Sequence, residues 1–351
     1  SIMAINVTKP SVNLREKLNE LETNKGLKGN EILQAETAQE VRSLIGAGRK
    51  NLIINGGFDV WQRGTSGTAV NGFNMSSADR WYSVRTQLNQ ETDTYGNPYA
   101  HCVCGNFTDT NYLQYKVEFP RKLLGKTLTL SYWIKSDDGL GQNGGLYIRY
   151  YTTGSGYETP VLESQKFGSE WTRVVRTFTM PTTAVYNDGY GLEIFIQGNN
   201  ATANNNTKTF DIKEVQLELG SVATDFEHRS YGEELALCQR YYERFVADAS
   251  QETLVCNGLS YTTTRTLANV FYLVEKRVKP TFSLNSSSDF QALTGSSGGW
   301  QTATGVSAVV GLRSARLDIS GLSGLTASGA CEIRLQTAAN GAHWFAFDAE
   351  L

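Results

Sequence analysis

Few residues in this chain of 351 have the types and spacing that catalysis requires. The three histidines, His101, His228 and His343, do not form the His-Glu-x-x-His pattern of a zinc hydrolase. The sequence contains neither a Gly-x-Ser-x-Gly nucleophile turn nor a glycine-rich loop followed by Lys-Ser or Lys-Thr. Two carboxylates could still cleave a glycan, but sequence spacing does not place them across a bond. We therefore predict a protein that is not an enzyme, with glycan hydrolysis as the least favoured alternative.

Aromatic side chains in polar loops are better candidates for binding chemistry. Their ring faces can stack on sugar rings, while neighbouring amides and carboxylates bond hydroxyl groups. Each ring could equally pack against its own sheet with only its polar edge in water. The candidates for carbohydrate binding are Tyr95, Tyr99, Tyr157, Tyr186 and Trp300. Four other tryptophans lie in strand-like runs and are predicted to be core residues, namely Trp61, Trp81, Trp133 and Trp171.

The composition argues against a nucleic-acid or membrane partner. Charged residues make up 19% of the chain, and Gly, Asn, Ser and Thr fill their place, which favours turns and short strands. The formal net charge of −3 leaves no basic footprint for nucleic acid. No apolar run approaches the ~18 residues of a membrane span. The N-terminus lacks the pattern of a signal peptide, so we expect a soluble protein made in a cytoplasm.

The elements that position these residues are predicted to be mainly strands. Beyond residue 50, apolar side chains recur at every second position in short segments separated by turn residues, which predicts half-buried strands in a sandwich or barrel. Near Lys213 and Glu214 the alternation slips by one residue, which predicts a β-bulge. The clearest alternating runs include Leu128, Leu130 and Tyr132; Leu146, Ile148 and Tyr150; and Leu192, Ile194 and Ile196.

The first 50 residues differ from the rest, because they contain no aromatic residue and show helical spacing instead. Each of the two short helices presents a thin apolar stripe, which favours a docking or self-association arm over helices folded onto the chain's own body. The stripe residues are Leu14, Leu18 and Leu21 in the first helix and Val41, Leu44 and Ile45 in the second.

A third helix is predicted where Ser230 and Glu233 form a possible capping box before Leu235, Cys238, Tyr242 and Phe245. The chain thus divides into a helical arm at 1–50, a β-sandwich domain at 51–229, a connecting helix at 230–250 and a smaller C-terminal β-sandwich at 251–351. The connecting helix could also face the same helix in neighbouring subunits.

Several segments resemble domains of bacteriophage fibre and virion proteins. Asn51–Gly64 (NLIINGGFDVWQRG) looks like their opening strand, and Ala78–Trp81 (ADRW) like the segment that follows. Gln216–Arg229 (QLELGSVATDFEHR) resembles their closing strand and exit, and is the most specific match. The next helix, Glu234–Arg244, and the terminal stretch Ala342–Leu351 are similar to later parts of these proteins. The opening Met3–Leu18 resembles the N-terminus of some cyanophage structural proteins.

The domain at 51–229 also resembles carbohydrate-binding modules with a jelly-roll fold. In such modules a structural calcium ion often links the opening and closing strands, which implies Asp59 and Glu214 as ligands here. Lys213 occupies the position where a first acid is often found, which departs from that pattern. Calcium requires six or more oxygen ligands, several of them backbone carbonyls. Ordinary polar roles for Asp59 and Glu214 are the alternative.

These resemblances imply a structural protein of the virion, of tail-fibre or appendage type, that binds a host surface glycan. Other virion proteins would dock on residues 1–50, and a homotrimer is expected because three-fold packing buries thin helical stripes. A purely structural capsid-decoration or tail-joining protein without a ligand is the alternative.

Overall fold

The structure is a computed structural model. It describes residues 50–75, 77–105, 111–118, 120–136, 145–152, 157–164, 167–184, 190–199, 208–247, 253–293, 299–337 and 343–350. These residues form four antiparallel sheets, one α-helix and two short 3-10 helices, which confirms the prediction of a mainly β protein with sandwich-like domains. The predicted arm helices, with Leu14, Leu18, Leu21, Val41, Leu44 and Ile45, lie outside the described residues.

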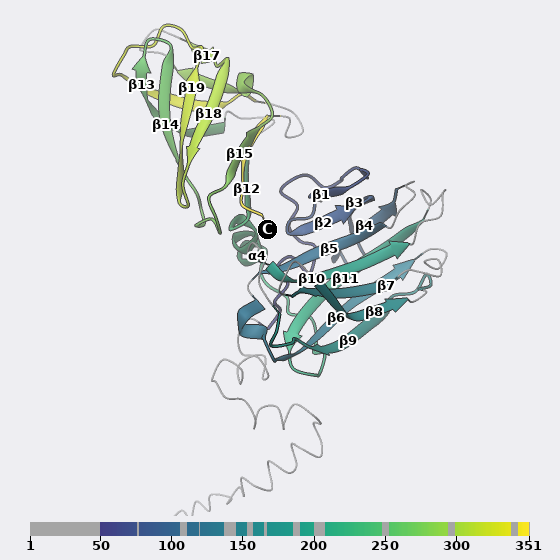
Figure 1. The fold of residues 1–351 in the computed structure, drawn as a ribbon. Helices are drawn as coiled ribbons and strands as arrows, with labels where there is room; N and C mark the ends of the chain where they lie inside the picture. The colour runs from purple at the N-terminus through teal and green to yellow at the C-terminus, as the bar shows by residue number, and fades with distance from the viewer. Residues whose placement is uncertain are drawn as a thin grey trace, which may run out of the picture.

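The first sandwich consists of a six-stranded and a five-stranded sheet (Figure 1). The six-stranded sheet has the order β1 (Phe73–Met75), β2 (Trp81–Val84), β5 (Asn111–Glu118), β10 (Tyr190–Asn199), β7 (Gly145–Tyr151) and β8 (Tyr157–Ser164). The five-stranded sheet has the order β3 (Thr86–Thr92), β4 (Pro98–Cys104), β11 (Thr209–Leu219), β6 (Thr127–Ser136) and β9 (Thr172–Thr179). The 3-10 helix η1 (Pro120–Leu123) precedes β6.

Alternation builds the core of this sandwich, because every second side chain of a strand points to the same face. The predicted runs on β6, β7 and β10 are buried between the two sheets, as expected. Trp81 lies at the centre of this core, 5.0 Å from both the Phe58 and the Tyr115 ring centroids. Trp61 is buried as well, so the prediction of core positions holds for these two tryptophans.

The predicted bulge lies on β11. The pairing register with β6 shifts between Lys213 and Gln216, and Glu214 has the left-handed backbone angle φ = 54°. The Val215 N–H donates to the Gly56 carbonyl at 2.9 Å, so the bulge holds the opening turn. A Cβ at position 56 would lie 2.1 Å from the Val215 oxygen, which explains the need for Gly56 there.

The helix α4 (Tyr231–Gln239) begins as predicted, with Ser230 accepting a hydrogen bond from the Glu233 N–H. It ends at Gln239, however, and the prediction that it extends to about residue 250 is wrong. Residues Tyr242–Val246 form strand β12 instead, paired with β21 (Trp344–Asp348). Tyr, Phe and Val suit a pleated surface, and Phe245 stacks on Phe345 with centroids 4.6 Å apart. This distant pairing overrides the local helical spacing.

The C-terminal region contains a three-stranded and a seven-stranded sheet (Figure 1). In the first, β21 lies between β12 and β15 (Thr281–Leu284). The second has the order β17 (Trp300–Thr302), β16 (Phe290–Leu293), β20 (Ala330–Leu335), β13 (Thr253–Thr262), β14 (Arg265–Phe271), β19 (Ser314–Ser320) and β18 (Gly305–Val310). The 3-10 helix η2 (Ser287–Asp289) precedes β16. Phe345 and Phe347 of β21 are fully buried in the shared core.

A buried ionic junction joins the two sandwiches. Arg80, just before β2, is 1% exposed and pairs with Glu350, which follows β21. Its guanidinium lies 3.6 Å from the Tyr241 ring centroid, between α4 and β12. Arg63 pairs with Asp348 at 3.2 Å, and the Gln62 side-chain amide donates to the Tyr242 carbonyl at 2.8 Å. The two sandwiches are therefore held by specific contacts as well as by the chain between them.

Candidate functional site

Two of the five predicted sugar-binding aromatics lie on the β3–β4 hairpin. Tyr95 is 89% exposed at its tip, in a turn held by Asp93, whose carboxylate accepts hydrogen bonds from the Tyr95 and Asn97 N–H groups at 2.9 Å each. These bonds to backbone and side-chain groups hold the pKa of Asp93 below its usual value. Tyr99 lies on the outer face of β4, on the side away from the buried Ala100 and Cys102.

Tyr157 and Trp300 lie on other parts of the molecule. Tyr157 is 59% exposed at the start of β8, on the other sheet, with the Arg149 guanidinium 4.8 Å from its ring centroid. Trp300 lies on β17 in the C-terminal region, under Arg334 at 3.8 Å. Tyr186 lies outside the described residues. The four candidates within the described residues thus lie on three separate surfaces.

Two tryptophans that we expected in the core lie beside Tyr99 instead. Trp133 and Trp171 are half-buried, so the prediction of core positions is wrong for both. On β6 the core side chains Leu130, Tyr132 and Ile134 share one phase, and Trp133 has the opposite one. That phase was readable from the sequence, because a strand sends successive side chains to opposite faces. Trp171 precedes β9 and carried no comparable signal.

Tyr99, Lys135, Trp171 and Lys213 form one aromatic–lysine cluster on the outer face of the five-stranded sheet. The rings of Tyr99 and Trp171 meet edge to face, with centroids 5.8 Å apart. The Lys135 and Lys213 ammonium groups lie 5.1 Å and 4.8 Å from the Trp171 centroid. Burial raises the pKa of Tyr99 and the nearby Asp211 adds to the effect, so its hydroxyl stays a hydrogen-bond donor at neutral pH.

Acidic side chains neutralise both lysines of this cluster. Lys213 pairs with Asp93 at 3.1 Å, and Lys135 pairs with Asp211 at 3.0 Å. Asp211 also lies 2.6 Å from the His101 Nδ1 atom. The face therefore offers hydrogen-bonding groups of both signs with little net charge, which suits a neutral, hydroxyl-rich ligand better than a strong anion.

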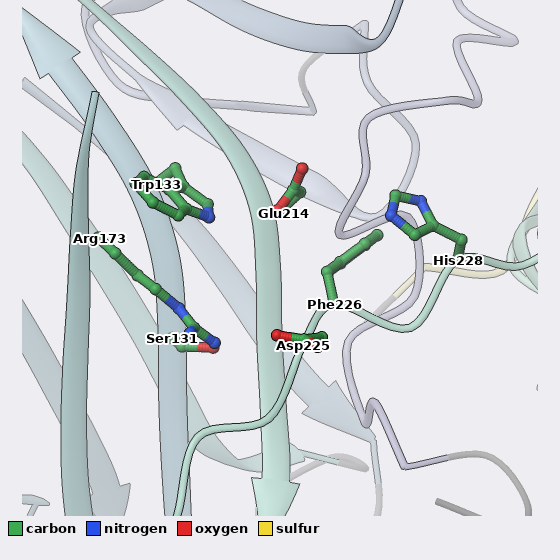
Figure 2. Close-up of a pocket in the computed structure, with 7 residues that line it drawn as sticks. All are labelled: Ser131, Trp133, Arg173, Glu214, Asp225, Phe226 and His228. Atoms are coloured by element: carbon green, nitrogen blue, oxygen red, sulfur yellow. The ribbon is translucent and has the colours of Figure 1, made fainter. Parts of the chain in front are cut away.

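A pocket adjoins the cluster, because Trp133 of β6 pairs with Lys213 of β11 on one side and with Arg173 of β9 on the other. Figure 2 shows Trp133 and Arg173 on one side of β11 and Phe226 and His228 on the other. The hollow has a volume of about 240 Å³. Its lining residues are Ser131, Trp133, Arg173, Glu214, Asp225, Phe226 and His228.

The bulge and the exit segment after β11 build this pocket together. The left-handed backbone at Glu214 brings its carboxylate to the hollow. The Arg173 guanidinium donates to the Thr224 carbonyl and so ties β9 to the exit segment. The Phe226 and His228 rings meet edge to face, 5.0 Å apart. Aromatic walls with a few converging polar groups are typical of small-molecule sites.

The residues implied as calcium ligands lie near the same bulge. Burial raises the pKa of Asp59, the Glu234 charge raises it further, and His228 opposes both effects. Protein groups already link the opening and closing segments: the Asn51 amide donates to the Val215 carbonyl at 3.0 Å, and its oxygen accepts from the Leu217 N–H at 3.1 Å. Among the described residues, no three His, Cys, Asp or Glu side chains form a cluster that could hold a metal. Calcium binding at Asp59 and Glu214 stays a prediction.

Comparisons with known proteins add only distant likenesses. No protein-family model matches the chain, and no curated protein matches it. Among solved structures, the N-terminal cellulose-binding domain of Cellulomonas fimi β-1,4-glucanase C is similar at 18% identity and a TM-score of 0.32, over 46% of this chain and 97% of that one. A structure described as CBM4 has 16% identity and a TM-score of 0.32, over 47% and 98%.

The CBM22-1 xylan-binding domain of Paenibacillus barcinonensis Xyn10C has 11% identity and a TM-score of 0.30, over 45% of this chain and 94% of that one. Likenesses at this level of identity and TM-score say nothing of the ligand of this chain. Separately, none of the helices in the described ranges is long and apolar enough to cross a membrane.

Proposed function

We propose that this chain is a non-enzymatic structural protein of a bacteriophage particle, of fibre or appendage type, that binds a host surface glycan on the outer face of its five-stranded sheet. The observation that carries the binding part is the continuity of the aromatic–lysine cluster with the Trp133 pocket. Sugar rings have apolar faces and hydroxyl edges, so a ligand can lie along half-buried rings while its hydroxyls bond to flanking polar groups.

On this face we assign ring stacking to the aromatic residues and hydrogen bonding to the charged residues. Trp133 and Trp171 are half-buried and belong to one sheet face, so each can offer a ring held in place by its neighbours. The carboxylates of Asp211 and Glu214 accept hydrogen bonds from hydroxyls, and Lys135 donates. Because Asp211 already pairs with Lys135, little reorganisation is needed on binding.

The particle context is proposed from the resemblance of 51–64 and 216–229 to phage fibre domains. In this proposal residues 1–50 dock the protein on other virion proteins, and three copies associate through the arm. A capsid-decoration or tail-joining protein without a ligand is the alternative. Imaging intact particles with an antibody against the chain would place it, and particles that lack the chain altogether would contradict the proposal.

A glycan array probed with the full chain tests the binding part. We expect Trp133→Ala and Trp171→Ala each to reduce the signal sharply, because each removes a ring from the same face. Tyr157→Ala and Trp300→Ala are matched controls, since both also remove an aromatic ring but from other surfaces. Loss of the signal in a control, with both tryptophan variants unaffected, would move the site elsewhere.

Glycan hydrolysis is the least favoured candidate, and the observation in its favour is that the pocket brings the carboxylates of Glu214 and Asp225 to one hollow. A glycosidase needs two carboxyl groups flanking the scissile bond. We expect the chain to release no reducing ends from any glycan that it binds. Release that disappears in both Glu214→Gln and Asp225→Asn would replace the binding proposal by an enzymatic one.

A further inference from the structure

In the described part of the chain, one face of the seven-stranded sheet is largely exposed. Its inner face holds the C-terminal core, whereas several large apolar side chains of its outer face stay in solvent. Leu259 is 51% exposed and Val309 is 59% exposed. Patches of this kind on a soluble protein usually mark an interaction surface.

Six exposed or half-buried side chains form one row across this face. The strand register pairs Val309 with Arg316, Arg316 with Asn269, and Asn257 with Glu332. Asn257 lies beside Asn269 because the next positions along β13 and β14 are paired, Gly258 with Ala268. Leu293 ends the row beside Glu332, because Ala292 pairs with Ile333. The order from β18 to β16 is Val309, Arg316, Asn269, Asn257, Glu332, Leu293.

The two halves of this row, on either side of a centre between β14 and β13, carry residues that complement each other in order. An asparagine lies on each side of the centre, then a charged residue of opposite sign, then an aliphatic residue. The adjacent row has the same centre, with Leu267 and Leu259 paired across it. A surface must match itself in this way when it packs on a copy related by a two-fold axis.

We propose that two copies of this chain associate face to face through this sheet, about a two-fold axis that runs parallel to the strands between β13 and β14. Such an axis places each of the six strands from β16 to β18 opposite its counterpart on the other side of the centre. Arg316 then faces Glu332 of the second copy, twice per dimer, and Leu259 faces Leu267 of the second copy. Stacked sheets pack about 10 Å apart with their strands nearly aligned, a distance that Arg and Glu side chains can bridge.

A hollow on the outer face of the sheet is also consistent with this two-fold axis. A hollow of about 410 Å³ lies on one half of the sheet, lined by Asn257, Leu293, Ala330, Cys331 and Glu332. The axis brings the exposed Val309 and Arg316 of the second copy over this hollow. Val309 of the second copy would thus meet Leu293, and Arg316 of the second copy would meet the carboxylate of Glu332. Both the shape and the charge of the hollow therefore favour a second copy of this chain.

The contact area of the sheet face determines how strong the dimer association is expected to be. Six strands about 4.8 Å apart and about 20 Å long give a contact near the lower end of specific interfaces. We therefore expect an association that depends on protein concentration. The proposal does not rest on glycan binding or on the arm, because it concerns a different surface.

Charge reversal tests it on the full chain, with the mass measured by light scattering and the dissociation constant by sedimentation equilibrium. We expect Arg316→Glu or Glu332→Arg alone to raise the dissociation constant at least about tenfold and to halve the mass, because each puts like charges together. The double variant Arg316→Glu, Glu332→Arg exchanges the two partners and should return the constant to within about threefold of the wild-type value. A purely structural effect would not be rescued.

The controls make the same charge changes away from this face. Lys122→Glu matches Arg316→Glu and Glu170→Arg matches Glu332→Arg, and both positions are exposed in the first sandwich. Leu259→Ser, which is expected to fold because its side chain is half in solvent, should also weaken association. A mass that stays the same in all single variants, a wild-type chain that shows no association, or a double variant that stays dissociated would each overturn the proposal.

Discussion

The outer faces of the five-stranded and seven-stranded sheets arise from the same alternation but carry different chemistry. On the first, lysines are neutralised within the chain by Asp93 and Asp211, and aromatic rings lie half-buried between them. On the second, Arg316 and Glu332 lie on opposite sides of a row whose aliphatic residues reach into solvent. Internal neutralisation suits a neutral ligand, whereas charges separated across a self-matching row suit a second copy.

The two faces can act separately only if the buried junction holds the two sandwiches together. The substitution that should destabilise this junction most is Arg80→Ala, because it leaves Glu350 buried without its main partner. We expect the free energy of unfolding to fall by about 3–5 kcal/mol, the usual result of breaking a buried ion pair. Denaturant unfolding measures it, with Arg313→Ala at an exposed ion pair as the control, for which a change below about 1 kcal/mol is expected. A loss as small as that of the control would mean that the junction contributes little.

Asp79, at the same junction, binds a proton more readily than an ordinary carboxyl group. Burial raises the pKa of Asp79 to about 7, although Arg63 and the Gln62 hydrogen bonds oppose the effect. Because the pKa is higher in the folded state, this group stabilises the fold fully below pH ~4 and loses that contribution as pH rises through ~7. The loss is at most about 4 kcal/mol for a shift of this size.

Asp79→Asn should therefore flatten the pH dependence of the free energy of unfolding between pH ~4 and ~8. The measurement is a series of denaturant titrations across that range for the wild type and the variant. Parallel curves would show that Asp79 does not titrate in this window. Glycan binding at the distant face should show no matching change.

Glycan binding and association should depend on different faces, so a substitution on one face should leave the other property unchanged. Trp171→Ala should weaken glycan binding by about thirtyfold, as expected for a binding residue worth about 2 kcal/mol, and leave the oligomer mass unchanged. Arg316→Glu should do the reverse and leave glycan affinity per chain unchanged. Calorimetry and light scattering on both variants decide the matter. A variant that changes both properties would show that the faces are coupled.

The smallest expected effect concerns Tyr157, which was predicted from its loop position. It lies under Arg149 on the other sheet of the first sandwich. We expect Tyr157→Ala to change glycan affinity by less than about twofold, since exposed substitutions away from a site have small effects. An effect as large as that of Trp171→Ala would place the ligand across both sheets.

Much of the fold could be predicted from short-range pattern. The buried runs on β6, β7 and β10 and the bulge at Glu214 follow from counting every second residue. The helix start at Ser230 follows from its capping chemistry. These features depend on neighbours within a few residues, so the sequence alone contains the information.

The candidate site is harder to predict from the sequence, because it depends on the order of the strands in the sheet. Tyr99 and Trp171 are far apart in the chain and meet only because β4 and β9 belong to one sheet. Trp133 has the phase opposite to that of Tyr132 and Ile134, so its position on the strand outweighs its large apolar side chain. The row from Val309 to Leu293 could not be read without the strand order.

The strand β12 has a consequence for the order of folding. Its partner β21 lies roughly a hundred residues further along the chain, and pairings this distant form late and slowly. Until β21 pairs, Tyr242–Val246 lacks the neighbour that joins it to β15, because β21 is the central strand of that sheet. Refolding should therefore complete this sheet, and with it the junction beside Tyr241, late.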